Sequence, residues 1–174
     1  MAFKNIVVAT DGSENALRAV STAADMAATH GAKVFVLHCV LEGPVPKGLL
    51  EWARIEHMIE ETNQPELPKW PGYGNLGVIG PNREPCVTYD ARLQLGRVIL
   101  DTATSRVREN GVRDIQEVFD EGDPAKAVLA LAQREGIDLA VLGTQGHGVF
   151  DQMFMGSSSY KLVAMAKMPV MTVP

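Results

Sequence analysis

The chain has 174 residues, of which 46% are hydrophobic and 21% charged, and its formal net charge at pH 7 is −5. This length and composition are typical of one globular domain with a sizeable core. The negative charge, without a cluster of lysine and arginine, argues against nucleic acid or an anionic membrane surface as a partner. Two cysteines make no disulfide framework, and no apolar stretch approaches the length that spans a bilayer.

The first forty residues predict a strand, a helix and a second strand. Residues 5–10 form a compact β-branched run, typical of a buried strand and not of a signal peptide, so we expect a cytoplasmic protein. Ser13 is expected to cap a helix that Gly31 ends. Residues 33–40 are apolar on both faces, which indicates a parallel sheet covered by helices on both sides.

The composition changes in the middle of the chain. Residues 43–87 hold seven of the ten prolines and both tryptophans. Within this stretch, residues 48–62 predict an amphipathic helix, whereas residues 63–86 are expected to be irregular. So long an irregular stretch inside a compact domain is usually functional or partly disordered. We interpret residues 43–87 as an insertion in a single domain that spans residues 1–174, and not as a second domain.

The rest of the chain returns to a regular alternation of helices and strands. Three helices are expected, over residues 88–110, 124–135 and 157–166. Three strands are expected, over residues 114–119, 138–142 and 169–173. The first of these strands alternates with polar residues, which favours a place near a sheet edge. With right-handed crossovers, this order predicts an α/β fold with a doubly wound parallel sheet.

A glycine-rich segment follows the strand at residues 138–142. Two residues separate Gly143 from Gly146, and nine separate Gly146 from Gly156. Three hydroxyl residues come next, namely Ser157, Ser158 and Ser159. Glycine lets backbone amides approach an anion, and a helix start leaves N–H groups without partners. The segment therefore predicts a phosphate-binding loop, although a serine at this place can also be a simple helix cap.

Other polar residues near these strands have two interpretations each. Because residues 143–160 contain no lysine or arginine, phosphates would need amides, hydroxyls and a divalent cation, which predicts moderate affinity with some metal dependence. His147 lies between two glycines and is either a phosphate contact or a solvated loop residue. His38 is expected to be a core or rim histidine with its hydrogen bonds made, and Cys39 a small buried hydrophobe.

Asp11 comes directly after the first predicted strand, as Gly143 comes after the strand at residues 138–142. In open α/β sheets, ligands bind beyond the carboxyl ends of strands, where the strand order reverses. If these two strands are neighbours, Asp11 and Gly143 face one crevice, and Asp11 can accept hydrogen bonds from ribose hydroxyls or an adenine amine. Alone, Asp11 would merely organise an Asp-Gly turn. The chain has no Walker A lysine and no evident nucleophile with a base, so catalytic residues stay unassigned.

These residues resemble the universal stress protein family. The matching segments are residues 7–13, 37–40, 122–125 and 143–169. The family's nucleotide motif, G-x2-G-x9-G followed by serine or threonine, fits Gly143, Gly146, Gly156 and Ser157 without gaps. The resemblance covers about residues 1–42 and 88–174 and implies a Rossmann-like, five-stranded parallel sheet in the order 3-2-1-4-5, similar to the adenine nucleotide alpha hydrolases.

The resemblance also implies the ligand and its contacts. ATP, or AMP or ADP, would lie across the crevice, with Mg²⁺ or Mn²⁺. By position, the adenosine end would be lined by Ala9, Thr10 and Asp11, and adenine contacted by Cys39 and Val40. The ribose and phosphates would run along Leu142, Gly143, Gly146 and His147. The phosphates would be held by Gly156, Ser157 and Ser158, with Ser159 close by.

In members of this family the last strand commonly forms a homodimer, and residues 169–173 are compatible with that role. The first expectation is therefore an ATP-binding regulatory protein of the stress response, with a protein partner that the sequence does not name. Two alternatives stay open. One is a dimeric interaction module that works without nucleotide, and the other is a slow ATP hydrolase or nucleotidyl-transfer enzyme. The insertion at residues 43–87 departs from the family pattern and could form a lid over the nucleotide, a partner surface or extra core. The resemblance therefore does not decide how a ligand would reach the pocket.

Overall fold

The computed structural model describes residues 2–40, 89–144 and 156–174. In these residues the chain forms five strands and four helices in strict alternation along the sequence, apart from the insertion. The strands are β1 (Asn5–Ala9), β2 (Lys33–Val40), β3 (Ile115–Glu121), β4 (Leu139–Gly143) and β5 (Val170–Val173). The helices are α1 (Glu14–His30), α3 (Tyr89–Glu109), α4 (Pro124–Glu135) and α5 (Ser157–Met165). The predicted insertion and its amphipathic helix lie outside the described residues.

The five strands form one parallel sheet in the order β3-β2-β1-β4-β5, so the predicted fold and strand order are confirmed. β1 lies in the centre, where Ala9 pairs with Leu37 of β2 on one side and with Leu142 of β4 on the other. β3 lies at one edge, as its polar alternation predicted, and β5 at the other.

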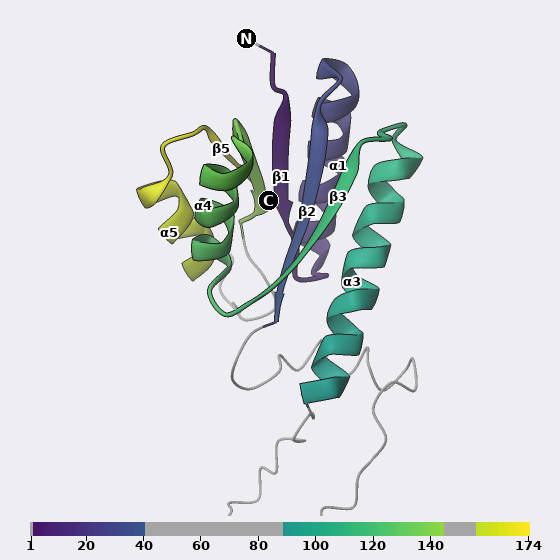
Figure 1. Cartoon of the computed structure of the whole chain (residues 1–174), viewed down its shortest axis with the longest axis vertical. Helices are drawn as coiled ribbons and strands as arrows, with labels where there is room; N and C mark the ends of the chain where they lie inside the picture. The colour runs from purple at the N-terminus through teal and green to yellow at the C-terminus, as the bar shows by residue number, and fades with distance from the viewer. Residues whose placement is uncertain (1, 41–88, 145–155) are drawn as a thin grey trace, which may run out of the picture.

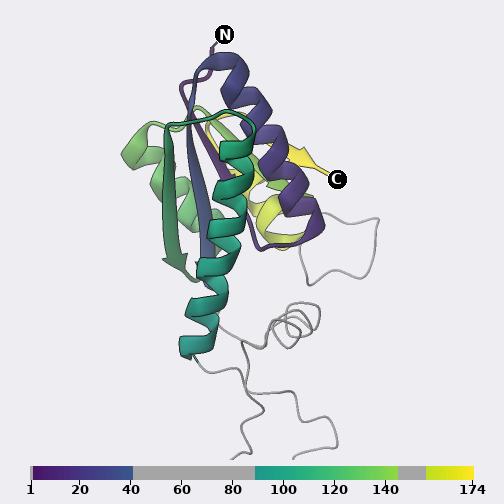
Figure 2. The same cartoon turned by 90° about the vertical axis from the view of Figure 1, so that its right-hand side faces the viewer.

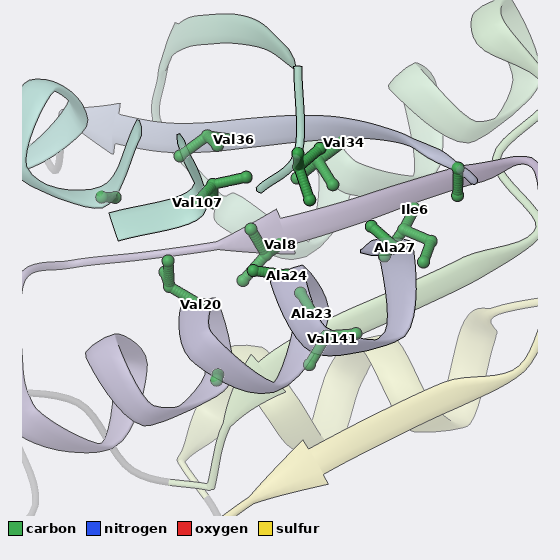
Figure 3. Close-up of a cluster of buried hydrophobic side chains, with 14 of the residues drawn as sticks. Ile6, Val8, Val20, Ala23, Ala24, Ala27, Val34, Val36, Val107 and Val141 are labelled. Atoms are coloured by element: carbon green, nitrogen blue, oxygen red, sulfur yellow. The ribbon is translucent and has the colours of Figure 1, made fainter. Parts of the chain in front are cut away.

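Helices cover both faces of this sheet, with α1 and α3 on one face and α4 and α5 on the other (Figures 1 and 2). The side chains of β1 alternate between the two cores. Ile6 and Val8 pack with α1 and α3, whereas Val7 packs with α4 and α5. Figure 3 shows the first core, in which Val20 and Ala24 of α1 lie against the strands.

Local sequence signals set the ends of α1 and α4. The Ser13 side chain accepts a hydrogen bond from Ala16 N, and Gly31 ends α1 in the left-handed region at φ 65°, as predicted. Asp123 caps α4 in the same way through Ala125 N, and Pro124 follows in the first turn. These caps satisfy backbone groups that a helix leaves without intrahelical partners.

The buried face of α1 consists almost entirely of alanine, with Val20 as the larger member. Because alanine side chains are short, the helix axis can come close to the sheet. This close approach determines the packing at the end of β4, described below. Among the described residues, no helix combines the length and the apolar composition that crossing a membrane requires.

Candidate functional site at the carboxyl ends of β1 and β4

The carboxyl ends of β1 and β4 lie side by side, as the crevice hypothesis required. Ala9 and Leu142 are the last residues that pair β1 with β4, so Thr10 and Gly143 follow this pair next to each other, with Gly143 still paired with Val173 of β5. The chain passes from β1 to β2 on one side and from β4 to β5 on the other, so the strand order reverses between them. In doubly wound sheets this switch point is where ligands bind.

The turn between β1 and α1 forms one wall of this site. Ser13 N donates a hydrogen bond to Asp11 Oδ1 at 3.0 Å, and Gly12 N donates to Thr10 Oγ1 at 3.2 Å. Gly12 has φ 80°, a region that favours glycine, and a Cβ at this position would lie 3.0 Å from the Ile99 side chain. Asp11 therefore organises the turn, as the simpler interpretation expected, and the same hydrogen bond fixes its carboxylate just beyond the carboxyl end of β1.

The end of β2 contributes a buried histidine beside this turn. His38 Nδ1 lies 2.9 Å from the carbonyl oxygen of Thr10, and the side chain is buried. Burial lowers the pKa of His38 from its ordinary value, while the hydrogen bond to Thr10 and the charge of Asp11 act in the opposite direction. The expected hydrogen-bonded histidine is confirmed. Its partner in the β1–α1 turn was not foreseen.

Cys39 and Val40, which the family resemblance places against adenine, follow His38 in β2. Burial raises the pKa of the Cys39 thiol to about 12, with a further contribution from the carboxylates of Asp120 and Asp123. The thiol therefore stays protonated at neutral pH, which agrees with its interpretation as a small buried hydrophobe. The carbonyl oxygen of Val40 accepts a hydrogen bond from Gly122 N at 3.0 Å.

The start of α5, the second wall of the candidate site, is bonded to the end of β4. Ser159 Oγ donates to the Gly143 carbonyl oxygen at 2.8 Å, and Gly156 N donates to the Thr144 carbonyl oxygen at 2.8 Å. These two bonds place Gly156 and the three serines beside the carboxyl end of β4. Gly146 and His147, the remaining members of the predicted loop, lie outside the described residues.

The packing of α1 against the end of β4 explains why residue 143 is a glycine. A Cβ at this position would lie 2.9 Å from the backbone carbon of Asn15 and 3.0 Å from Ala16 N, both in the first turn of α1. Only glycine fits this approach without a shift of the helix. The packing of the neighbouring helix therefore requires a glycine at this position, whether or not a ligand binds there.

The three serines of α5 do not cap their helix. The N-cap is Gly156, which has no side chain to cap the helix, in contrast to Ser13 of α1 and Asp123 of α4. Ser157 is exposed, Ser158 is half-buried, and the buried Ser159 uses its hydroxyl on Gly143. The first-turn N–H groups of a helix have no intrahelical acceptor. Among the described residues, no side chain caps this helix start, and its first-turn donors and hydroxyls lie at a place that suits an anion.

One basic residue lies just beyond the segment without lysine or arginine. Lys161 Nζ lies 2.7 Å from Asp123 Oδ2, so an ion pair joins α5 to the start of α4. The hydrogen bond from Lys161 is the main cause that lowers the pKa of Asp123. Sequence reasoning missed this pair, because the two residues are far apart in the chain. Within the described ranges, no group of three or more His, Cys, Asp and Glu side chains could hold a metal ion.

Residues 2–174 of this chain match the model of the universal stress protein family. A universal stress protein of Thermus aquaticus is 33% identical over 171 residues, which are 98% of either chain. The chain belongs to the universal stress protein family. The site at the switch point is thus a site of a universal stress protein domain.

Solved structures agree on the fold. A universal stress protein in complex with cAMP has a TM-score of 0.61 at 24% identity, over 100% of this chain and 98% of the other. The universal stress protein of Archaeoglobus fulgidus in complex with dAMP also has a TM-score of 0.61, at 19% identity over 100% of both chains. At these identities the likeness concerns the architecture alone.

Proposed function

We propose that the protein binds an adenine nucleotide, with ATP as the main ligand, and acts as a nucleotide-dependent regulator in the stress response. The observation that carries this proposal is the hydrogen bond from Ser159 Oγ to the Gly143 carbonyl oxygen. It brings an uncapped helix start to the end of β4, next to the turn that presents Asp11. The complexes of two related proteins with cAMP and dAMP support the choice of an adenine nucleotide.

In the proposed complex, the adenosine end of the nucleotide contacts the β1–α1 turn and the phosphate end contacts the start of α5. The adenosine end would lie on Ala9, Thr10 and Asp11, with adenine against Cys39 and Val40. The phosphates would lie at Gly156, Ser157 and Ser158, where amides and hydroxyls can donate hydrogen bonds. Ser159 would support this wall through Gly143 without a direct contact. Mg²⁺ or Mn²⁺ would enter with the phosphates, which supply hard oxygen ligands.

Isothermal titration calorimetry tests this proposal. Protein freed of carried-over ligand is titrated with ATP in the presence of Mg²⁺ or Mn²⁺, and we expect saturable binding that weakens when the metal is chelated. Mass spectrometry of the ligand released from freshly purified, denatured protein identifies the natural nucleotide. Absence of any heat at millimolar ATP, together with no released nucleotide, would contradict the proposal.

A second candidate is a dimeric interaction module that works without nucleotide. Two residues favour it, because structure alone explains them: Asp11 accepts a hydrogen bond that organises the β1–α1 turn, and Gly143 makes room for α1. A Gly143→Val variant does not separate the two functions, since its side chain would clash with α1 in either case. Substitutions at Ser157, which is exposed, and Ser158, which is half-buried, separate them, because the described residues show no hydrogen bond that depends on these two side chains.

For both candidates we propose a homodimer through β5. Among the described residues, five large hydrophobic side chains are exposed, and three of them lie on α5, namely Tyr160, Val163 and Met165. The edge strand β5 is only half-buried. An apolar edge left uncovered favours association.

Analytical ultracentrifugation is expected to show a dimer that a Tyr160→Asp, Val163→Asp double variant weakens. A monomer at micromolar concentration in the unmodified protein would rule the dimer out.

A further inference from the structure

His38 is a polar side chain in an otherwise apolar strand. It points to the same face of the sheet as Val34 and Val36, which pack in the core with α1 and α3. Its side chain is 7% exposed, whereas the other buried polar residues of the described chain belong to β1's end or to helices. Burial of an imidazole costs free energy unless a hydrogen bond compensates for it. A polar side chain at this buried position therefore depends on its hydrogen bond, and the partner of that bond indicates its role.

The partner of His38 identifies the state of the ring. Nδ1 lies 2.9 Å from the carbonyl oxygen of Thr10, which can only accept a hydrogen bond. Nδ1 must therefore carry the proton, and the neutral ring is the Nδ1–H tautomer. The bond joins two segments that are 28 residues apart in the sequence.

This hydrogen bond continues the attachment of β1 to β2 beyond the paired strands. The paired register ends at Ala9 and Leu37, and Thr10 N then donates to the Leu37 carbonyl oxygen at 2.9 Å. The imidazole of His38 donates from Nδ1 to the carbonyl oxygen of Thr10, the second backbone group of that residue. Both backbone groups of Thr10 are thus fixed by β2, directly before the turn that carries Asp11.

The surroundings of the ring leave it little freedom. A Cβ added to Gly96 of α3 would lie 2.9 Å from His38 Cδ2 and 2.7 Å from the Phe119 ring. The rings of His38 and Phe119 have centroids 5.9 Å apart. A glycine in the interior of α3 is unfavourable for the helix by itself. Here it makes room for the imidazole, so three elements hold the ring in place.

We infer that His38 is a positioning residue of the nucleotide site: by holding the Thr10 carbonyl oxygen, it fixes the β1–α1 turn and so the place at which Asp11 meets the adenosine end of the ligand. This inference rests on the proposed function. His38 itself does not contact the nucleotide. Its loss lowers affinity through the turn, and a side chain that restores a donor at the place of Nδ1 restores affinity.

Three variants separate this role from general stability. His38→Leu removes the donor, and ATP affinity measured by calorimetry is expected to fall about tenfold, the value of one well-placed buried hydrogen bond. His38→Asn places an amide N–H near the position of Nδ1, and its affinity is expected within about threefold of the unmodified protein. Val36→Ala, in the same strand and on the same face, destabilises the core and is expected to leave affinity unchanged.

Amide hydrogen exchange separates a loosened turn from a destabilised core, because a destabilised core does not raise the exchange rates of the turn amides selectively. The amides of Gly12 and Ser13 donate to Thr10 Oγ1 and Asp11 Oδ1 in the turn. In His38→Leu these two amides are expected to exchange faster than in the unmodified protein while the amides of the sheet keep their rates, and in Val36→Ala they are not selectively accelerated. If His38→Leu does not fold, His38→Gln replaces it, because its amide nitrogen lies near the place of Nε2 and is expected to weaken binding.

The outcomes distinguish the two proposals. If the unmodified protein binds ATP and His38→Leu, or His38→Gln in its place, binds equally well, the positioning role is wrong and the proposed function stands. Equal losses in Val36→Ala, or failure of His38→Asn to restore affinity, also overturn the positioning role. If the unmodified protein binds no adenine nucleotide, the proposed function fails, and this inference fails with it.

Discussion

The two walls of the site differ in how their polar groups are satisfied. In the β1–α1 turn, the side chains of Thr10, Asp11 and Ser13 accept hydrogen bonds from the backbone N–H groups of Gly12, Ser13 and Ala16, respectively, and His38 closes the turn from β2. At the start of α5 the cap is a glycine without a side-chain hydrogen bond, and Ser157 is exposed. The first wall is complete without a ligand. Within the part of the chain that the structure describes, no side chain caps the second wall, so an anion can accept hydrogen bonds from the first-turn N–H groups there.

The largest expected effect comes from placing a charge at the second wall. Ser158→Asp puts a carboxylate beside the first-turn amides of α5, where it stabilises the helix start and repels phosphate. We expect ATP affinity to fall at least about 100-fold, equivalent to roughly 2.7 kcal/mol, while the melting temperature stays the same or rises. Calorimetry and thermal unfolding measure the two quantities.

Ser105→Asp is the control for this variant, because Ser105 is an exposed serine on α3. It adds the same charge away from the start of α5 and is expected to leave affinity unchanged. If Ser158→Asp retained ATP binding, the start of α5 would not hold the phosphates.

The next effect tests the packing at the junction of the two walls. Gly143→Ala places a Cβ 2.9 Å from the backbone of Asn15, so α1 or β4 must shift. We expect the free energy of unfolding to fall by about 1–3 kcal/mol, as in other overpacked cores. Because the cause is packing, the loss is expected in denaturant titrations without any nucleotide. An unchanged midpoint would show that the first glycine is there for the ligand alone.

A smaller effect concerns pH and the first wall. The folded protein holds the pKa of His38 below 6.5, the ordinary value that the unfolded chain has. The unfolded chain therefore takes up the proton first, and stability falls as the pH drops below about 6.5. We expect the free energy of unfolding to be highest above this pH and to decrease between pH 7.5 and 5.5. His38→Asn is expected to lose this slope, and an equal slope in both proteins would exclude His38 as its source.

The smallest effect is expected at the ion pair behind the second wall. Lys161→Met breaks the contact with Asp123, which still caps α4 through Ala125 N. The side chain of Lys161 is 53% exposed, and surface ion pairs contribute little. We expect the free energy of unfolding to change by less than about 0.5 kcal/mol, with the difference fading at high salt. A large, salt-independent loss would mean that α5 depends on α4 for its place.

Local patterns predicted the elements well because their causes are local. Ser13, Gly31 and Asp123 act within a few residues of their own helices, and the apolar run of β2 needs no partner to be recognised. The polar alternation of β3 correctly indicated an edge. The strand order was expected from the family resemblance and not from any single pattern, because the pairing of β1 with β4 joins residues that are far apart in the chain.

The parts of the site that sequence reasoning missed are contacts between distant segments. His38 meets Thr10, Lys161 meets Asp123, and Gly143 meets the first turn of α1. No local pattern carries these pairs, because they depend on which strands are neighbours and on how closely α1 approaches the sheet. The placement of the nucleotide, its metal and the dimer remain predictions.

The close fit of Gly143 against α1 changes how its motif should be used in other chains. A relative that has stopped using nucleotides would still need a glycine at that point, since the helix would otherwise be displaced. Retention of the first glycine is thus weak evidence of ligand binding. The residues at the start of α5 can change more freely once a relative no longer binds a nucleotide. Their identity is therefore the better indicator of nucleotide binding.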